Sequence, residues 1–223
     1  MYTIAMIGQK GGGGKTTVGT ALAVEAARAE LAALIIDLDP QANAANWKDR
    51  RPVDNPAVVA APVARLRPTL EAARTHGADF VVIDTPAKSD SAAVDAARAA
   101  DLVLIPVWPQ IYHLETLNAL KDLLRIGGDV RAYVVLNGLH PQATRQAEDA
   151  KAMIAEIYDL PVCPTHLSVR AIYADVPAIG KSAQEVEPDG KAAEEVERLY
   201  AFVTQQLNGA TDGKPKEFAT SGQ

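Results

Sequence analysis

Short apolar runs alternate with longer segments of helical periodicity along the whole chain. Most of these runs are nearly continuous in Val, Ile, Leu and Ala, as in strands that are buried on both faces of a parallel sheet. Runs of this kind predict strands at 2–8, 31–37, 57–62, 79–86, 101–107, 130–138 and 160–167. The segments between them predict helices over 15–30, 41–50, 64–76, 89–100, 113–126, 142–158 and 189–207.

This alternation is typical of an α/β fold, in which a mostly parallel, twisted sheet carries helices on both faces. In the last predicted helix an apolar stripe recurs at three- and four-residue steps, through Val196, Leu199, Tyr200, Val203 and Leu207. The residues that follow are polar and small. We therefore expect one folded domain over residues 1–207, followed by a disordered C-terminal tail over residues 208–223.

Composition narrows the class of protein. The chain has 223 residues, of which 48% are apolar and 22% charged, which favours a single soluble domain with a sizeable core. A net charge of −6 argues against a constitutively basic nucleic-acid binder, although one conformational or oligomeric state can still form a local basic patch. The single cysteine, Cys163, excludes an intrachain disulfide and a four-thiolate metal site, and fits a reduced cytoplasmic setting. No apolar run reaches the roughly 18 residues of a membrane-spanning helix.

The stretch GQKGGGGKTT, residues 8–17, carries the most specific chemistry. Between a strand and a helix, consecutive glycines let the backbone wrap around a phosphate, with several N–H groups pointing inward at the positive end of the helix. Lys15 is expected to neutralise the β- and γ-phosphates of a nucleotide, and the Thr16 hydroxyl to ligate Mg²⁺. The ordinary P-loop pattern would place glycine where Gln9 stands, and a second lysine, Lys10, follows. A glycine-rich turn of a Rossmann-like fold is the alternative interpretation.

Two more predicted strands end in carboxylates. Asp37 and Asp39 follow the strand at 31–37, and Asp84 closes the apolar part of the strand at 79–86. A P-loop site needs a carboxylate that organises magnesium and a group that orients the attacking water. The carboxyl ends of parallel strands form the ligand crevice of such a sheet, so we expect these residues to converge on the P-loop. Capping of the next helix is the alternative, above all for Asp37.

The segment KGGGGKTT resembles the deviant Walker A motif, K-G-G-x-G-K-[ST]-[ST], of the ParA/MinD superfamily of ATPases. In that family the early lysine, here Lys10, is the signature residue. The resemblance implies that Lys10 reaches across a nucleotide-sandwich homodimer to the partner's phosphates. It implies ATP and Mg²⁺ as cofactors and a P-loop NTPase fold. The nucleotide contacts that it implies come from Lys10, Gly11, Gly12, Gly13, Gly14, Lys15, Thr16 and Thr17.

The resemblance extends to the acidic motifs. LIIDLDPQAN resembles the family's D-x-D-P-Q motif, which implies that Asp39 positions or activates the hydrolytic water and that Asp37 supports the site. VVIDTP resembles the Walker B motif, in which Asp84 holds Mg²⁺ through water, together with Thr16. The catalytic residues implied are therefore Lys10, Lys15 and Asp39. Asn137 stands at a strand end where the family often recognises adenine.

Two later segments resemble surfaces of the family. IPVWPQIYHLETL corresponds to a turn near the dimer interface, where Trp108, Tyr112 and His113 contact a partner subunit or simply pack locally. LSVRAIYADVPAIGKS resembles the segment that supplies basic residues to a DNA-binding face. Its DNA-binding candidates are Arg170 first and Lys181 second. Arg145 and Lys151, on the helix predicted over 142–158, are further candidates, and ordinary solvated charge is the alternative for each.

The resemblance covers residues 1–207 and selects a branch of the superfamily. The nitrogenase iron protein needs paired cysteines, which this chain lacks. MinD-type proteins end in a basic amphipathic helix that the segment KPKEFATSGQ cannot form, so we expect no membrane contact. The chain begins at the first predicted strand, as in short ParA proteins without a helix-turn-helix domain. One departure is Gly8, where many relatives have asparagine, and we assign it no consequence.

The expected function is that of a ParA-type partition ATPase, cytoplasmic and nucleoid-associated. By resemblance it dimerises with ATP, binds DNA non-specifically, and hydrolyses ATP when a small centromere-binding, ParB-like protein stimulates it. The cargo is then a plasmid or a chromosome. Alternatives are a ParA-like positioner of a protein cargo that uses an adaptor protein, a metabolic P-loop ligase that phosphorylates a carboxylate, and a regulator that binds nucleotide without useful turnover. Retention of Asp39 argues against the regulator.

Overall fold

A six-stranded, all-parallel sheet forms the centre of the protein in a computed structural model that describes residues 1–209. Its strands lie in the order β3-β2-β4-β1-β5-β6. Their bounds are β1 Tyr2–Met6, β2 Ala33–Asp37, β3 Ala57–Ala60, β4 Phe80–Asp84, β5 Leu102–Val107 and β6 Ala132–Leu136. The expected α/β architecture is confirmed, and the chain folds as a single domain of this class.

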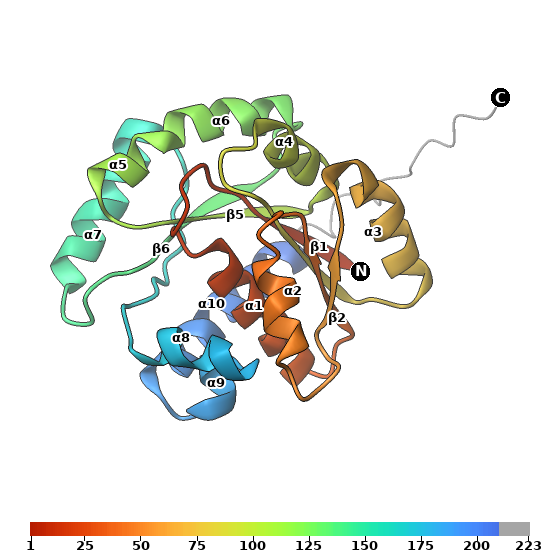
Figure 1. Cartoon of the computed structure of the whole chain (residues 1–223). Coiled ribbons are helices and arrows are strands. Elements are labelled where there is room, and N and C mark those ends of the chain that lie inside the picture. The colour runs from red at the N-terminus through yellow and green to blue at the C-terminus, as the bar shows by residue number, and fades with distance from the viewer. Residues whose placement is uncertain (210–223) are drawn as a thin grey trace.

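Helices cover both faces of the sheet (Figure 1). One face packs on α3 (Leu66–Thr75), α4 (Asp90–Ala99), α6 (Thr116–Ile126) and α7 (Thr144–Met153). The other face packs on α1 (Lys15–Arg28), α2 (Asn43–Asp49) and α10 (Lys191–Asn208). Successive strand residues point to opposite faces, so Ile83 joins the first core and Val82 the second. This double burial explains why the strands are apolar throughout.

Sheet register brings the acidic strand ends together. In the β2–β4 ladder Asp37 pairs with Asp84, and in the β1–β4 ladder Met6, just before the glycine loop, pairs with the same aspartate. All three strands run in parallel, so their carboxyl ends meet at one edge of the sheet. The predicted convergence of the two strand ends with the P-loop is present in the fold.

The predicted strand at 160–167 is present only as isolated contacts. Val162 forms a single parallel bridge to Val134 of β6, and a second bridge joins Ser168 to Leu139. Pro161 and Pro164 interrupt this segment, and proline has no N–H to donate to a ladder. The segment therefore follows the edge of the sheet without becoming a seventh strand in the described residues.

The helices differ from the prediction mainly because two of the expected helices are each divided into two elements. The helix expected over 113–126 is α5 (Ile111–Leu114) followed by α6, and the one expected over 142–158 is α7 followed by a π-helical turn, Ile154–Tyr158. The segment ahead of α10 contains α8 (Ile172–Asp175), a 3₁₀ turn, Val176–Ile179, and α9 (Ala183–Val186), none of which the sequence predicted. Short helices of four residues contain too few turns to show an apolar period.

The predicted stripe of α10 faces the core. Val196, Leu199, Val203 and Leu207 are buried there, and Tyr200 packs against Phe80. The predicted boundary at residue 207 stays a prediction, because residues 210–223 of the expected tail lie outside the described residues. Within residues 1–209, no helix combines the length and the apolar character needed to cross a bilayer.

Candidate nucleotide-binding site

A tight glycine loop joins β1 to α1 at the carboxyl edge of the sheet. Gly12 and Gly14 have φ angles of +78° and +98°, a left-handed conformation that glycine adopts without a steric penalty. A side chain on Gly14 would also collide with the amide of Asn137. The backbone path that this loop needs therefore requires glycine at its last position before the helix.

Lys15 is folded into the loop. The residue is only 8% exposed. Its Nζ donates to the carbonyl oxygen of Gly8 at 3.1 Å and to that of Lys10 at 3.5 Å. Burial lowers the pKa of Lys15, and the nearby carboxylates of Asp84 and Asp39 partly offset that shift. A buried ammonium beside the N-terminus of a helix is well suited to meet an anionic phosphate.

Thr16 and Asp84 form a pair of oxygen ligands at the loop. The Thr16 hydroxyl donates to Asp84 Oδ2 at 2.7 Å. Asp84 is 1% exposed, and its other oxygen, Oδ1, has no hydrogen-bond partner within residues 1–209. Burial is the main reason that the pKa of Asp84 rises to about 7. A buried carboxylate with an unsatisfied oxygen next to a hydroxyl fits the hard oxygen ligands that Mg²⁺ prefers.

The described residues contain no cluster of three or more His, Cys, Asp or Glu side chains that could hold a metal by themselves. Magnesium is usually bound through one or two carboxylates together with water and substrate phosphates, so a site for it needs no such cluster. Thr16 and Asp84 are therefore the residues that could hold Mg²⁺ alongside a nucleotide.

The two aspartates after β2 have different surroundings. Asp37 is buried, and its Oδ2 accepts hydrogen bonds from the backbone N–H groups of Ala44 and Ala45 at 3.0 and 3.1 Å, in the first turn of α2. Its Oδ1 accepts the N–H of Asp39 at 3.0 Å. Asp37 thus caps α2 and orients the loop that carries Asp39. Asp39 itself is half-buried and accepts the N–H of Gln41 at 2.9 Å.

A cavity of about 540 Å³ opens above the glycine loop. It has three walls: the loop with the start of α1, the loop and helix after β2, and the segment that contains α8 and α9. Asp39 lines the second wall and Tyr173 the third. The size is sufficient for a bound small molecule, and the first wall contains the predicted phosphate site.

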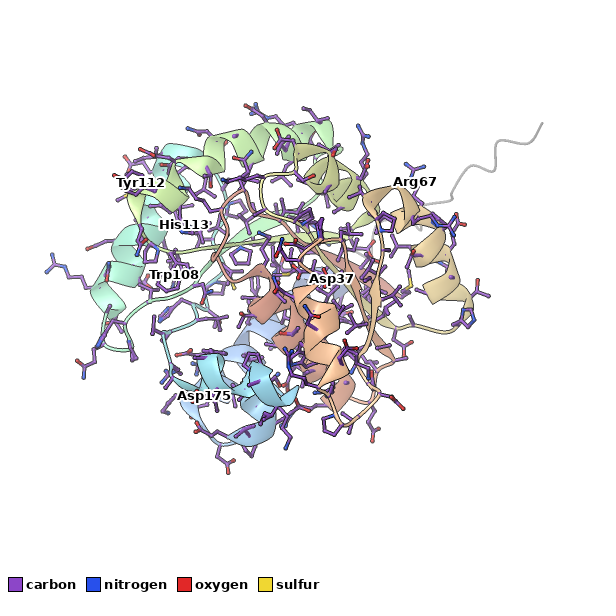
Figure 2. All side chains as sticks on the ribbon, viewed as in Figure 1. Asp37, Arg67, Trp108, Tyr112, His113 and Asp175 are labelled. Carbon is purple, nitrogen blue, oxygen red and sulfur yellow. The ribbon has the colours of Figure 1, made fainter. Side chains whose placement is uncertain are left out.

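Lys10 lies over the ring of Tyr112, with Nζ 5.7 Å from the ring centroid. Tyr112 is 69% exposed, and the pKa of His113 is lowered by partial burial and then by the charge of Lys10. Trp108 packs against Gly138, and its indole nitrogen has no hydrogen-bond partner in the described part of the chain. Figure 2 shows Trp108, Tyr112 and His113 together near α5, well separated from Asp37 on the α2 side. Their predicted contact with a partner subunit stays a prediction.

Asn137 braces the glycine loop. Its Nδ2 donates to the carbonyl oxygen of Gly13 at 3.0 Å, and its Oδ1 accepts the N–H of Gly138 at 2.8 Å. Its predicted contact with adenine remains a prediction, but the structural contact with the loop was missed. A bond between residues 124 positions apart leaves no local sequence signal.

Three of the basic residues predicted to contact DNA have partners within the protein, and the fourth lines the cavity. Arg170 forms an ion pair with Glu195, and Lys151 donates to Glu148 and to the carbonyl oxygen of Pro164. Arg145 lies 3.9 Å from Asp149 on the exposed face of α7. Lys181 lines the third wall of the cavity. Contact with DNA stays a prediction for all four.

Sequence reasoning missed several cavity-lining residues. These come from α2 and from the α8–α9 segment, and are Trp47, Arg50, Tyr173, Val176 and Pro177. The resemblance had pointed to the α8–α9 segment, but only as a source of basic residues. No periodicity marks it, and its neighbours in space lie more than 120 positions earlier in the chain.

Comparison with known proteins agrees with this geometry. The profile of the family described as the CobQ/CobB/MinD/ParA nucleotide binding domain matches residues 4–187. The chain is 29% identical to the chromosome-partitioning ATPase Soj of Thermus thermophilus, with 93% of this chain and 97% of Soj covered. It is 30% identical to the maintenance of carboxysome distribution protein A of Gloeobacter kilaueensis, with 92% and 93% covered.

Solved structures share the fold. MinD from Pyrococcus horikoshii in complex with Mg-ADP superposes with a TM-score of 0.74 at 19% identity, with 96% of this chain and 99% of MinD covered. The pNOB8 ParA bound to nonspecific DNA superposes with a TM-score of 0.69 at 17% identity, with 93% and 99% covered. A glycine loop with a buried lysine, a Thr–Asp pair and a family profile that spans most of the domain lead to one conclusion: the chain belongs to the CobQ/CobB/MinD/ParA nucleotide-binding family.

Proposed function

We propose that this protein is a ParA-type ATPase that uses ATP to switch between a free monomer and a DNA-bound homodimer. The observation that carries the proposal is that Lys15, Thr16 and Asp39 line one cavity, while the buried Asp84 accepts a hydrogen bond from Thr16. An additional lysine, Lys10, is exposed on the same loop. A plain nucleotide-binding protein needs Lys15, Thr16 and Asp84 but has no use for Asp39 or Lys10.

Each of these residues has a task in hydrolysis. Lys15 and the glycine loop bind the phosphates and neutralise their charge. Thr16 and Asp84 are the residues that would hold Mg²⁺, and the ion would neutralise negative charge on the phosphates. Asp39, held by the turn to Gln41, orients the attacking water and accepts its proton. Lys10 contacts the phosphates bound to the partner subunit, so that hydrolysis depends on dimerisation.

Dimerisation also gives an acidic chain a way to bind DNA. A monomer with a net charge of −6 has little general attraction for a polyanion. Two subunits that meet in one orientation can place the basic side chains of both on a single face, and binding through phosphate contacts is then sensitive to salt. ATP controls the dimer and therefore controls the DNA-bound state. The similarity to the chromosome-partitioning ATPase Soj supports chromosome partition as the biological role. A plasmid as the cargo and a ParB-like protein as the partner are further parts of the proposal.

The similarity to the carboxysome distribution protein supports a second candidate role, in which the same ATPase cycle positions a protein cargo through an adaptor protein. Both roles use the same site and the same DNA surface. They differ only in the partner, so the ATPase residues do not distinguish them.

Binding of unrelated duplex DNA tests the proposal. We would measure it at low and moderate salt without nucleotide, with Mg-ADP and with Mg-ATP, for the native chain and for Asp39→Ala. We expect binding only with ATP, stronger in Asp39→Ala because it cannot hydrolyse the nucleotide, and weaker as salt rises. Lys15→Gln is the matched control and should not bind DNA in any nucleotide state. ATP turnover without DNA binding in any state would contradict the proposal and favour a metabolic ligase.

A further inference from the structure

Residues 172–186, which we call the strap, lie directly on α2. Three side chains of α2 and its C-terminal end donate to strap carbonyl oxygens. Trp47 Nε1 donates to Lys181 at 3.0 Å, Arg50 Nε to Pro177 at 2.9 Å, and Arg51 Nη1 to Gly180 at 3.1 Å. The position of the strap is therefore fixed by the helix that follows the Asp39 loop.

A shielded ion pair adds to this contact. Arg51 donates two hydrogen bonds to Glu185, at 2.8 and 2.9 Å, and its side chain is only 2% exposed. Glu185 also accepts the N–H of Ser182 at 2.9 Å, which closes a capping box on α9. Gly180, with φ of +64°, lies so close to the backbone of Arg51 and its predecessor that any side chain there would clash. The strap is built to fit closely against α2.

The ammonium of Lys181 is left without a partner in this arrangement. Its backbone carbonyl is used by Trp47, but its side chain makes no hydrogen bond or ion pair within residues 1–209. Lys181 lines the same cavity as the phosphate loop. Among the lining residues the charged ones are Lys15, Arg50, Lys181 and a single carboxylate, Asp39. In a chain of net charge −6, this cavity carries an excess of positive charge.

We propose that Lys181 is a phosphate-binding residue for the nucleotide of its own subunit, and that the Arg51–Glu185 pair positions it by holding the strap against α2. The proposal rests on the proposed function, because it takes the ligand to be a nucleoside polyphosphate. A free ammonium in the cavity that also contains the phosphate loop can add a charge-assisted hydrogen bond to an anion held by Lys15. Lys181 then belongs to the nucleotide site and not to a DNA surface.

Calorimetric titration of the full chain with Mg²⁺ and a non-hydrolysable ATP analogue, without DNA, tests this assignment. Lys181→Ala removes the ammonium but leaves the backbone bond to Trp47, so the strap stays in place. We expect it to weaken nucleotide binding by about tenfold, the effect of losing one charge-assisted hydrogen bond. Lys181→Arg should restore most of the affinity. Lys191→Ala, which removes an exposed lysine from α10, is the matched control and should bind like the native chain.

Glu185→Gln tests the positioning step. It should weaken nucleotide binding in the native background but have little further effect in Lys181→Ala, because both changes act through the same ammonium. A purely structural role of Glu185 would instead give the same loss in both backgrounds. Circular dichroism of each variant verifies that it is folded.

Three outcomes would overturn the assignment. Lys181→Ala could bind the analogue as tightly as the native chain, or it could keep nucleotide binding and lose only ATP-dependent DNA binding, which would return Lys181 to the DNA surface. Equal losses on Glu185→Gln in both backgrounds would remove the positioning role. If the native chain binds no nucleotide at all, the proposed function fails together with this inference, whereas tight native binding with an unchanged Lys181→Ala variant overturns this inference alone.

Discussion

Arg170 Nη2 lies 2.6 Å from Glu195 Oε1, in an ion pair that ties the segment after β6 to α10. Glu195 is buried and also accepts the N–H and the hydroxyl of Ser168, at 2.9 and 2.8 Å. The basic side chain that the sequence offered first for DNA therefore has a structural partner. If a variant that lacks the Arg170 side chain loses DNA binding, the loss has to be distinguished from a loss of protein stability.

We expect Arg170→Ala to lower the free energy of unfolding by about 3 kcal/mol, because it leaves a buried carboxylate without its counter-charge. Arg145→Ala removes an arginine from a pair whose side chains are both largely exposed, and should change the free energy of unfolding by less than about 0.5 kcal/mol. Urea unfolding of both variants at neutral pH measures the difference. Equal changes in the free energy of unfolding in the two variants would show that the Arg170–Glu195 pair stabilises the protein no more than an exposed ion pair does.

The same pair gives a pH dependence. Burial opposes ionisation of Glu195, but the hydrogen bonds from Arg170 and Ser168 outweigh it, and the pKa of Glu195 lies below its ordinary value. A carboxyl group with a lowered pKa in the folded state stabilises the protein above its unfolded pKa, roughly 4.3, and loses that contribution as the pH falls through the folded pKa. The stability gap between the native chain and Arg170→Ala should therefore be full at pH 7 and shrink below about pH 4.

Within residues 1–209, Lys10 is not among the residues that line its own nucleotide cavity. It lies over the exposed ring of Tyr112, a contact that contributes only about 0.5–1 kcal/mol at such sites. We expect Lys10→Ala to bind ATP with near-native affinity but to remain monomeric and fail to hydrolyse it. Light scattering coupled to size exclusion, with Mg-ATP, measures the dimer. Lys191→Ala, which removes an exposed lysine from α10, is the control and should dimerise like the native chain. A fully active Lys10→Ala variant would show that Lys10 has no role in turnover.

Asp84 is the clearest place to test the magnesium site. The unsatisfied Oδ1 is well placed for a cation, so Asp84→Asn should remove most of the increase in nucleotide affinity that Mg²⁺ produces. The nucleotide-free protein should at the same time become more stable, by a few degrees in melting temperature, because an amide replaces a buried and partly unsatisfied carboxylate. Thermal unfolding with and without Mg-ADP measures both effects. A variant that is destabilised and still responds fully to Mg²⁺ would contradict this role of Asp84.

Sequence reasoning succeeded where structure is encoded locally. The glycine loop acts through its own backbone, so the residues from Gly11 to Thr16 were sufficient to place it between a strand and a helix. The central strands were equally clear, because β4 and β5 are buried on both faces and are apolar from end to end. Even the capping role of Asp37 was an open alternative, since an aspartate just before a helix often accepts its first N–H groups.

The parts that could not be predicted depend on contacts between distant segments. The strap is made of short helical turns without a period, and its place is set by bonds such as that from Trp47 to Lys181, 134 positions apart. Arg170 and Glu195 were both visible as charges, but nothing in the sequence shows that they pair. Charged residues are therefore the least predictable members of the site, because their roles depend on the neighbours that folding brings to them.

Asp37 and Asp39 stand two positions apart and offer a matched pair of variants. Asp39 lines the cavity and accepts one N–H from the loop, so Asp39→Ala should unfold much like the native chain, bind ATP, and lose about 100-fold or more in turnover. The ATP-bound dimer should then persist.

Asp37 instead caps α2 and holds the Asp39 loop, so Asp37→Ala should lower the free energy of unfolding by about 2 kcal/mol. Single-turnover hydrolysis and urea unfolding of both variants separate the two roles, because one aspartate acts on the rate and the other on stability. If Asp39→Ala turns over ATP rapidly, the water-orienting group lies elsewhere. If instead both variants are equally unstable, Asp39 belongs to the cap and its place in the cavity has no catalytic meaning.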